Sequence, residues 1–282
     1  MIDEVMMLRH GRTQYNLEHR LQGQIDVPLD IVGQWQADQT GYALASHYYW
    51  AKVSRLAADP EAIAQPGAGA AERSDIRQWQ EAPAAARRMV VYSSDLFRAQ
   101  QTAHAFADLM GLDVTLDPRL RERSFGRWEG LTRAEIKAQD AEAYASWKRH
   151  TGGETRYGVE SRAQVGERGA RAVRDIIAAM DAASGDTPTT LMIVGHGSWI
   201  TATIGTLLGL DPDGMNALGG MRNACWCRLK VRHTVNGRTI AEPLFELEEY
   251  NKAPAIADNA DWENGPADLR GPHTPDWQPI VW

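Results

Sequence analysis

The sequence predicts an α/β fold, a three-layer sandwich in which helices flank a mostly parallel central sheet. Short apolar runs of strand length alternate with longer helical patterns along the chain. Turn residues separate these segments, such as the Gly-Asp-Thr-Pro that precedes the most apolar run. The alternation implies crossover helices, and strands joined by crossover helices run parallel.

The elements can be assigned in chain order. Strands are expected at 4–8, 89–94, 113–118 and 189–197, and helices at 32–56, 95–110, 132–150, 159–183 and 198–209. The last of these helices ends at a glycine, as helices commonly do. Near the C-terminus, the runs CWCRLKVRH and TIAEPLFELEEY flank Val-Asn-Gly, and this arrangement predicts a β-hairpin.

Composition narrows the class of protein. The chain has 282 residues, of which 43% are apolar, so it can bury a sizeable core. A net charge of −7 disfavours a polyanion-binding surface, so no nucleic-acid partner is expected, although a locally positive pocket could still bind a small anion. The N-terminus lacks a signal-peptide pattern, and no stretch approaches the ~20 apolar residues that span a bilayer. We expect a soluble cytoplasmic protein with no membrane partner.

The number and spacing of the cysteines also agree with a cytoplasmic protein. Cys225 and Cys227 are the two cysteines of the chain and stand two residues apart in an expected strand. Side chains at this spacing on a strand point the same way, so a disulfide between them would be strained. Two thiols alone also make a poor structural zinc site. We expect both cysteines to be reduced.

The chain divides into a main domain at 1–250 and a tail at 251–282. Residues 57–88 hold eleven alanines together with prolines and glycines, which is typical of a linker or a loosely ordered insertion. This insertion precedes the strand at 89–94, whereas ligands of such sheets bind beyond the carboxyl ends of strands. We therefore expect a subunit contact, as in a homodimer, or a mobile loop in preference to a lid over the site.

The tail is polar and rich in proline, yet it contains three large aromatic side chains, Trp262, Trp277 and Trp282. Three tryptophans in a disordered segment would expose much apolar surface. We expect them to dock as anchors on the core or on a partner chain.

Functional groups follow the ends of four strands. They are Arg9-His10-Gly11, Arg98, Glu122 and His196-Gly197. Singly, each group has an ordinary explanation, such as a surface ion pair, a structural histidine or a solvated charge run. To explain all four groups in this way requires four coincidences. The carboxyl ends of parallel strands meet at one edge of a sheet, so we expect these groups to lie close together.

The chemical types at these strand ends complement one another. Guanidinium groups match the geometry of phosphate oxygens, and the helix expected after Gly197 offers an N-terminus that favours anions. A histidine in such a pocket can attack phosphorus and form a phosphohistidine. Neighbouring cations disfavour its protonated form. A carboxylic acid at the rim can protonate the leaving oxygen and then deprotonate water.

Five motifs resemble those of the histidine phosphatase superfamily, also called the phosphoglycerate mutase-like family. In order they are LRHGRTQYN (8–16), RLQGQIDVPLDIVGQWQA (20–37), YSSDLFRAQQTA (92–103), LRERSFGRWEG (120–130) and VGHG (194–197). The resemblance covers residues 4 to about 210 and implies the phosphoglycerate mutase-like fold.

The resemblance also implies a role for each residue. His10 would be the nucleophile, and Glu122 the general acid and then the base. The residues that would hold the phosphoryl oxygens are Arg9, Arg98 and His196. The residues that would line the substrate site are Asn16, Gln22, Gly23, Arg123 and Gly197, with Arg123 a candidate for a second anionic group. No metal and no cofactor are implied.

The family contains both phosphatases and mutases. The segments SFGRWEG and GGETRYGVESR resemble the phosphatase branch, whereas family mutases carry a Glu-Arg-His-Tyr-Gly pattern and a long basic insertion. We predict a metal-independent phosphomonoesterase that acts on a small phosphorylated metabolite through a phosphohistidine. The alternative is a cofactor-dependent phosphoglycerate mutase primed with 2,3-bisphosphoglycerate. A non-catalytic phosphate-binding module is less well supported, because both His10 and Glu122 are present.

The sequence leaves open which side chains contact the part of the substrate beyond the phosphoryl group. Tyr15, Phe125 and Trp128 could pack on a substrate, and packing within the protein core or a cap is the alternative.

Overall fold

The computed structural model describes residues 1–58, 89–184, 188–211 and 218–269. The helices are α1 (Gln14–Leu17), α2 (Ile31–Ala58), α4 (Phe97–Met110), α5 (Arg133–Gln139), α6 (Ala141–Lys148), α7 (Arg162–Ser184) and α8 (Gly197–Leu207). The strands are β1 (Ile2–Arg9), β2 (Met89–Ser93), β3 (Val114–Leu116), β4 (Thr189–Gly195), β5 (Trp226–Val235) and β6 (Arg238–Lys252). Among these described residues, no helix is both long and apolar enough to cross a membrane.

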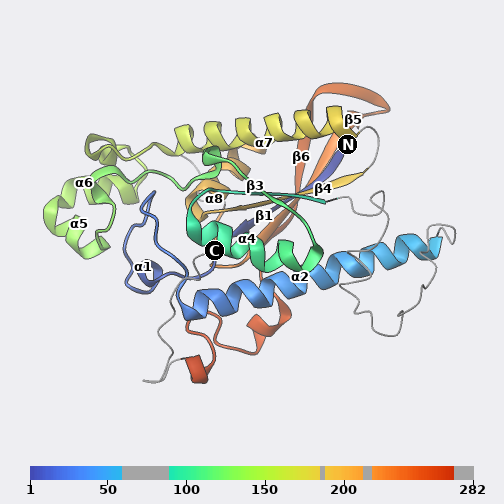
Figure 1. Ribbon diagram of the computed structural model, residues 1–282. Coiled ribbons are helices and arrows are strands. Elements are labelled where there is room, and N and C mark those ends of the chain that lie inside the picture. The colour runs from blue at the N-terminus through green and yellow to red at the C-terminus, as the bar shows by residue number, and fades with distance from the viewer. Residues whose placement is uncertain (59–88, 185–187, 212–217, 270–282) are drawn as a thin grey trace.

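The strands form one six-stranded sheet in the order β3-β2-β4-β1-β5-β6 (Figure 1). The first four strands in this order pair in parallel, and β5 and β6 extend the sheet as antiparallel neighbours. Helices cover both faces of the sheet, with α7 and α8 on one side and α2 and α4 on the other (Figure 1). The predicted three-layer α/β sandwich is confirmed.

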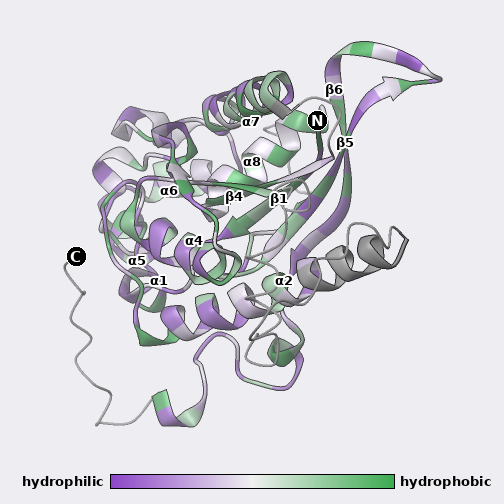
Figure 2. Cartoon of the chain, turned by 45° about the vertical axis from the view of Figure 1, so that its right-hand side comes forward, coloured by the Kyte–Doolittle hydropathy of each residue, from purple (hydrophilic) through white to green (hydrophobic). Residues whose placement is uncertain are grey.

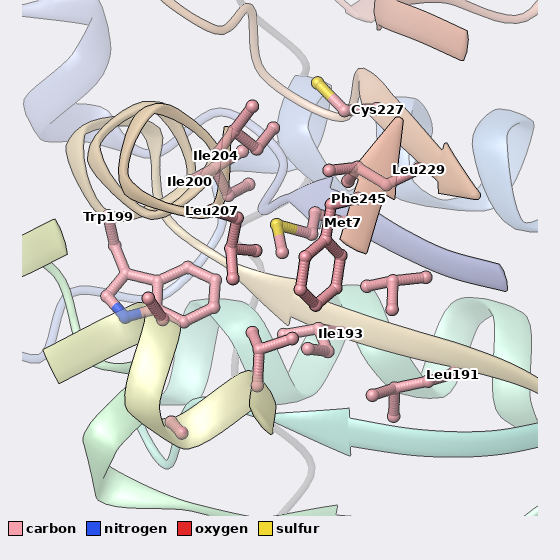
Figure 3. Packing of buried hydrophobic residues seen from close by; sticks show 14 of the residues in the cluster. Met7, Leu191, Ile193, Trp199, Ile200, Ile204, Leu207, Cys227, Leu229 and Phe245 are labelled. Atoms are coloured by element: carbon pink, nitrogen blue, oxygen red, sulfur yellow. The ribbon is translucent and has the colours of Figure 1, made fainter. Parts of the chain in front are cut away.

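The alternation of side chains along β1 divides the core between the two faces. Val5 and Met7 pack in the cluster that includes α7 and α8, which Figure 3 shows around Met7, Ile193 and Trp199. Met6 and Leu8 pack in the cluster that includes α2 and α4. Successive residues of a strand point to opposite faces, so one apolar run supplies both layers.

The predicted hairpin is also confirmed. Asn236 and Gly237, with φ of 50° and 74°, form the turn between β5 and β6, the backbone that a tight hairpin turn favours. The far end of this hairpin extends away from the body of the molecule (Figure 2). Cys225 and Cys227 are buried and free.

The prediction of one helix over 132–150 is wrong. Two helices occupy this range, and the chain bends between them at Asp140, whose backbone is extended at φ −158°. The Asp140 carboxylate accepts a hydrogen bond from the Ala143 N–H at 2.9 Å and so begins α6 as its N-cap. The strand expected at 113–118 is shorter than predicted and forms an edge of the sheet as β3.

Nearly all of the expected insertion at 57–88 lies outside the described residues, as do Trp277 and Trp282. The placement of the insertion, and its suggested role as a subunit contact, therefore stay predictions. Trp262 is described, and its side chain is 2% exposed, as expected for an anchor on the core.

Gly41 allows α2 and α4 to pack closely. A Cβ at Gly41 would lie 2.3 Å from the Ala105 carbonyl oxygen, which belongs to the backbone of the facing helix. Helix propensity alone predicts that Gly41→Ala stabilises the protein by about 1 kcal/mol. The close packing predicts instead that Gly41→Ala lowers the free energy of unfolding, by about 1–3 kcal/mol.

Urea denaturation of the Gly41→Ala variant would measure this difference in the free energy of unfolding. Gly219→Ala is a control, because a Cβ there would meet no atom within 4 Å. Stabilisation of the Gly41→Ala variant would contradict the close packing of the two helices.

Candidate active site

A cavity of about 680 Å³ opens at the carboxyl ends of the parallel strands. It is lined by nearly all of the predicted site residues: Arg9, His10, Asn16, Gln22, Gly23, Arg98, Glu122, Arg123 and Gly197. His196 lies behind this surface and is fully buried, with its ring centroid 5.2 Å from that of His10. Side chains more than a hundred residues apart in the chain are thus brought to one place.

The His10 ring has a defined tautomer. Its Nδ1 lies 2.6 Å from the Gly11 carbonyl oxygen, which can only accept a hydrogen bond, so Nδ1 carries the proton. In a neutral imidazole, Nε2 then keeps its lone pair. Burial lowers the pKa of His10 well below its usual value, and the charges of Arg98 and Arg9 lower it further. The His10 imidazole is therefore held in the neutral, nucleophilic form.

Arg98 is fully buried in the first turn of α4. Its two terminal nitrogens each donate at 2.8 Å, one to the Ile25 carbonyl and one to the Gly23 carbonyl. Burial lowers the pKa of Arg98 to about 10, and Glu122 acts in the opposite direction. Gly23 has a φ of +53°, and a Cβ there would lie 2.1 Å from a Glu129 carboxylate oxygen. The loop at 23–25 thus folds around the guanidinium of Arg98.

Several buried polar atoms at the site have no hydrogen-bond partner among the described residues. They include Arg9 Nε, Arg98 Nε, His196 Nδ1 and Gln22 Oε1. The other ring nitrogen of His196 lies 2.9 Å from Ser94 Oγ. Buried polar groups are nearly always paired, so unpaired groups gathered at one cavity suit a polar ligand. Two guanidiniums among them favour an anionic one.

Glu122 is held at the N-terminus of α8. Its carboxylate accepts hydrogen bonds from the Ser198 N–H at 3.1 Å and the Trp199 N–H at 3.0 Å. The Arg123 N–H donates to the same carboxylate at 2.7 Å. Backbone donors at a helix N-terminus orient a carboxylate without using a side chain. The carboxyl group of Glu122 is therefore fixed in the wall of the cavity.

The segment at 124–160, called here the cap, holds Arg123 through more contacts than expected. Its Nε donates to the Glu160 carbonyl at 2.6 Å, and its Nη2 donates to the Glu154 carboxylate at 3.0 Å. Both members of the Arg123–Glu154 pair are buried. Burial lowers the pKa of Arg123. Arg123 lines the cavity, but these two nitrogens are already used within the protein.

The cap has a small hydrophobic core of its own. Phe125, Trp128 and Ile136 are buried in one cluster, and Trp147 packs against it. Trp128 is fully buried, which supports the packing alternative for this side chain. Phe125 is in the same cluster but also lines the cavity.

Asn223 was not found by reasoning from the sequence. Its Nδ2 lies 3.1 Å from each of three oxygens, the carbonyls of His10 and Gly11 and the Oδ1 of Asn16. The amide of Asn223 therefore holds the loop that carries His10. One asparagine in a loop before β5 carries no signal of this role, because the contact spans more than two hundred residues.

Arg168 of α7 was also not found. Its Nη1 donates to the carbonyls of Arg119 and Arg121, at 2.6 Å and 2.9 Å, and so supports the segment that leads to Glu122. Its Nη2 donates to the Glu160 carboxylate at 3.0 Å. In the sequence, Arg168 is one of several cations on a helix with a solvated face.

Comparison with known proteins agrees with this geometry. Residues 5–57 and 70–239 match the family model of the histidine phosphatase superfamily, branch 1. A glucosyl-3-phosphoglycerate phosphatase of Mycolicibacterium vanbaalenii is 31% identical over 92% of this chain and 98% of its own length. A protein of Yersinia enterocolitica named a probable phosphoglycerate mutase is 29% identical over 82% of this chain and 86% of its own.

Two solved structures extend the comparison. One, named mycobacterial hydrolase 2, matches with a TM-score of 0.69 at 29% identity and covers 91% of this chain and 94% of its own. A mycobacterial glucosyl-3-phosphoglycerate phosphatase in complex with inorganic phosphate matches with a TM-score of 0.64 at 28% identity, covering 89% of this chain and 98% of its own. The resemblance predicted from the motifs is confirmed, and the chain belongs to the histidine phosphatase superfamily.

Proposed function

We propose that this protein is a phosphomonoesterase that transfers the phosphoryl group of a small phosphorylated metabolite to His10 and then to water. One observation carries the proposal. His10 is a buried imidazole whose Nδ1 is occupied by the Gly11 carbonyl, which leaves Nε2 as a nucleophile. Two guanidiniums with unpaired nitrogens lie at the same cavity, where a phosphoryl group needs positive charge.

In the first half of the reaction, His10 Nε2 attacks phosphorus. The P–N bond forms as the ester P–O bond breaks, and the Glu122 carboxylic acid gives its proton to the leaving oxygen. Arg9, Arg98 and His196 bind the phosphoryl oxygens in this proposal, and the charge of the two guanidiniums stabilises the transition state. The unpaired nitrogens of these three residues support that assignment.

In the second half, the Glu122 carboxylate takes a proton from water. The oxygen of that water attacks phosphorus, the P–N bond breaks, and inorganic phosphate leaves with His10 neutral again. Asn16 and Gln22 line the cavity and add hydrogen bonds to the phosphoryl group in this scheme. The two guanidiniums supply the positive charge that a metal ion supplies in other phosphatases, so we propose that the reaction needs no metal or cofactor.

The cavity also limits the substrate. Its volume of about 680 Å³ exceeds what a phosphoryl group requires, so part of a metabolite can enter with the phosphate. Arg133 also lines it, which favours an ester with further negative charge. Relatives named glucosyl-3-phosphoglycerate phosphatase make that ester the first to test. A cytoplasmic location and a homodimer stay predictions.

A mutase remains the second candidate, because the Yersinia relative carries that name. Both activities use the same phosphohistidine, and they differ in whether water or a second hydroxyl accepts the phosphoryl group. Isomerisation of 3-phosphoglycerate primed with 2,3-bisphosphoglycerate would therefore be measured beside phosphate release.

The His10→Ala variant tests the proposal. We expect phosphate release from a panel of phosphomonoesters, including glucosyl-3-phosphoglycerate, and a loss of about 10³-fold or more in the variant. His104→Ala is the matched control, because His104 is an exposed histidine on α4. Unchanged release in His10→Ala would refute the mechanism, and isomerisation faster than release would favour the mutase.

The protonation of His10 and His196 can be measured by NMR of labelled histidine, with signals assigned by loss in single variants. Burial is the largest cause that lowers both pKa values well below 6.5, and Arg98 is the next. Both rings should therefore still be neutral at pH 6.5, where a free histidine is half protonated.

The lowered pKa values of His10 and His196 also determine how the free energy of unfolding changes with pH. Below about pH 6.5 the unfolded chain binds protons that the native state does not, so this contribution to the free energy of unfolding falls as the pH falls. In the NMR titration, a midpoint at or above pH 6.5 for His10 or His196 in the protein without ligand would contradict the account.

A further inference from the structure

The chain beyond β6 returns to the active site. Residues 253–269, called here the strap, pass beside the N-terminal half of α2 and are drawn in red in Figure 1. The family match ends at residue 239, so the strap lies outside it. Glu263 of the strap nevertheless lines the cavity, where its carboxylate pairs with Arg222 at 3.0 Å.

Trp262 anchors the strap. Its side chain is 2% exposed, and its ring centroid lies 5.2 Å from that of Trp35 in α2. The indole N–H donates to the backbone carbonyl of Asn223 at 2.9 Å. The Gln36 side chain donates to the Trp262 carbonyl at 2.6 Å. Trp262 is therefore bonded through both its side chain and its backbone.

Both partners of Trp262 reach the loop that carries His10. The Asn223 amide donates to the His10 and Gly11 carbonyls at 3.1 Å. The Gln36 Oε1 accepts from the Arg12 N–H at 2.8 Å. Two short hydrogen-bonded paths thus run from one tryptophan to the loop at 10–12, one through Asn223 to His10 and Gly11 and one through Gln36 to Arg12.

A third contact joins the strap to the same loop directly. The Arg12 guanidinium donates to the Glu263 carbonyl at 2.8 Å and to the Asp30 carboxylate at 2.8 Å. The strap therefore contacts the loop at 10–12 directly through Arg12, in addition to the paths from Trp262.

We propose that the strap is part of the catalytic apparatus and that Trp262 is a positioning residue, which acts through Asn223 on the loop bearing His10. The proposal rests on the proposed function, in which Nε2 must be aligned with phosphorus. The Arg98 contacts come from α4 and from the loop at 23–25, so the position of Arg98 does not depend on the strap.

The Trp262→Phe variant removes the indole N–H and keeps an aromatic ring and the backbone carbonyl. We expect kcat to fall about tenfold, because small misplacements of a reacting group are costly, with KM changed by less than about twofold. Trp226→Phe is the matched control. It loses a similar bond, from the indole N–H to the Glu249 carboxylate at 3.2 Å, away from the cavity.

A second variant guards against a change in packing. In 3-benzothienylalanine, sulfur replaces the indole N–H within a ring system of nearly the same shape. Its incorporation at position 262 should lower kcat as Trp262→Phe does. Wild-type kcat in this variant would overturn the role of the N–H.

A double-mutant cycle tests whether Trp262 acts through Asn223. The Asn223→Ala variant keeps the backbone carbonyl that Trp262 binds and the Ala224 N–H that donates to the His10 carbonyl at 3.1 Å, and it removes the side-chain link to His10. Adding Trp262→Phe to Asn223→Ala should then lower kcat by a smaller factor than Trp262→Phe does in the wild type, because part of the path to His10 is already lost. Additive losses would mean that Trp262 acts by another route and would overturn the proposal.

Amide hydrogen exchange gives a readout that does not depend on activity. Exchange in the peptide covering residues 8–17 should be faster in Trp262→Phe than in wild type or Trp226→Phe, because the loop loses its support. Unchanged exchange would overturn the proposal, even if the protein hydrolyses phosphate esters. Faster exchange in a protein without esterase activity would leave the strap's hold on the loop established and the proposed function refuted.

Discussion

The burial of two guanidiniums beside two imidazoles is the constraint on which the rest of the structure depends. Positive charges placed together away from water are costly unless acceptors surround them. Backbone carbonyls meet much of this need, since Arg98 donates to Gly23 and Ile25, and Arg9 donates to Met221. The loops that approach the carboxyl edge of the sheet are shaped by these bonds, so the pocket is formed before any ligand enters.

The buried guanidiniums also give His10 and Glu122 different environments. Cations and burial together favour a neutral His10, which is the form that can attack phosphorus. A phosphate ester brings the negative charge that the buried guanidiniums lack. Glu122 is set apart from this cluster by its bonds to the first N–H groups of α8, which orient it toward the cavity. The proposed nucleophile and the proposed acid therefore come from different strand ends and have different neighbours.

Much of the fold could be predicted because local patterns determine it. Apolar runs such as that of β4 mark buried strands, and parallel strands bring their carboxyl ends to one edge. The order of these runs along the chain is therefore enough to predict that His10, Arg98 and Glu122 meet there. The break at Asp140 had a visible signal, an aspartate able to cap a helix three residues before Ala143, but the helical pattern on both sides concealed it.

Other features could not be predicted, since they exist only in the folded chain. Asn223 supports His10 across more than two hundred residues, and its type alone does not distinguish it from other loop asparagines. Arg123 stands beside Glu122 in the sequence, but its pairing with Glu154 depends on how the cap folds. For Trp262, composition indicated docking, whereas its partner Asn223 and its link to His10 are visible only in the folded chain.

The most direct test of the account is to trap the phosphorylated enzyme. Rapid quenching of the reaction with a ³²P-labelled ester, followed by peptide mapping, should give acid-labile phosphate on the peptide that contains His10. The label should appear at the rate of turnover or faster and disappear when water completes the reaction. Turnover without any label, or label on a peptide that lacks His10, would contradict the claim that the buried imidazole is the nucleophile.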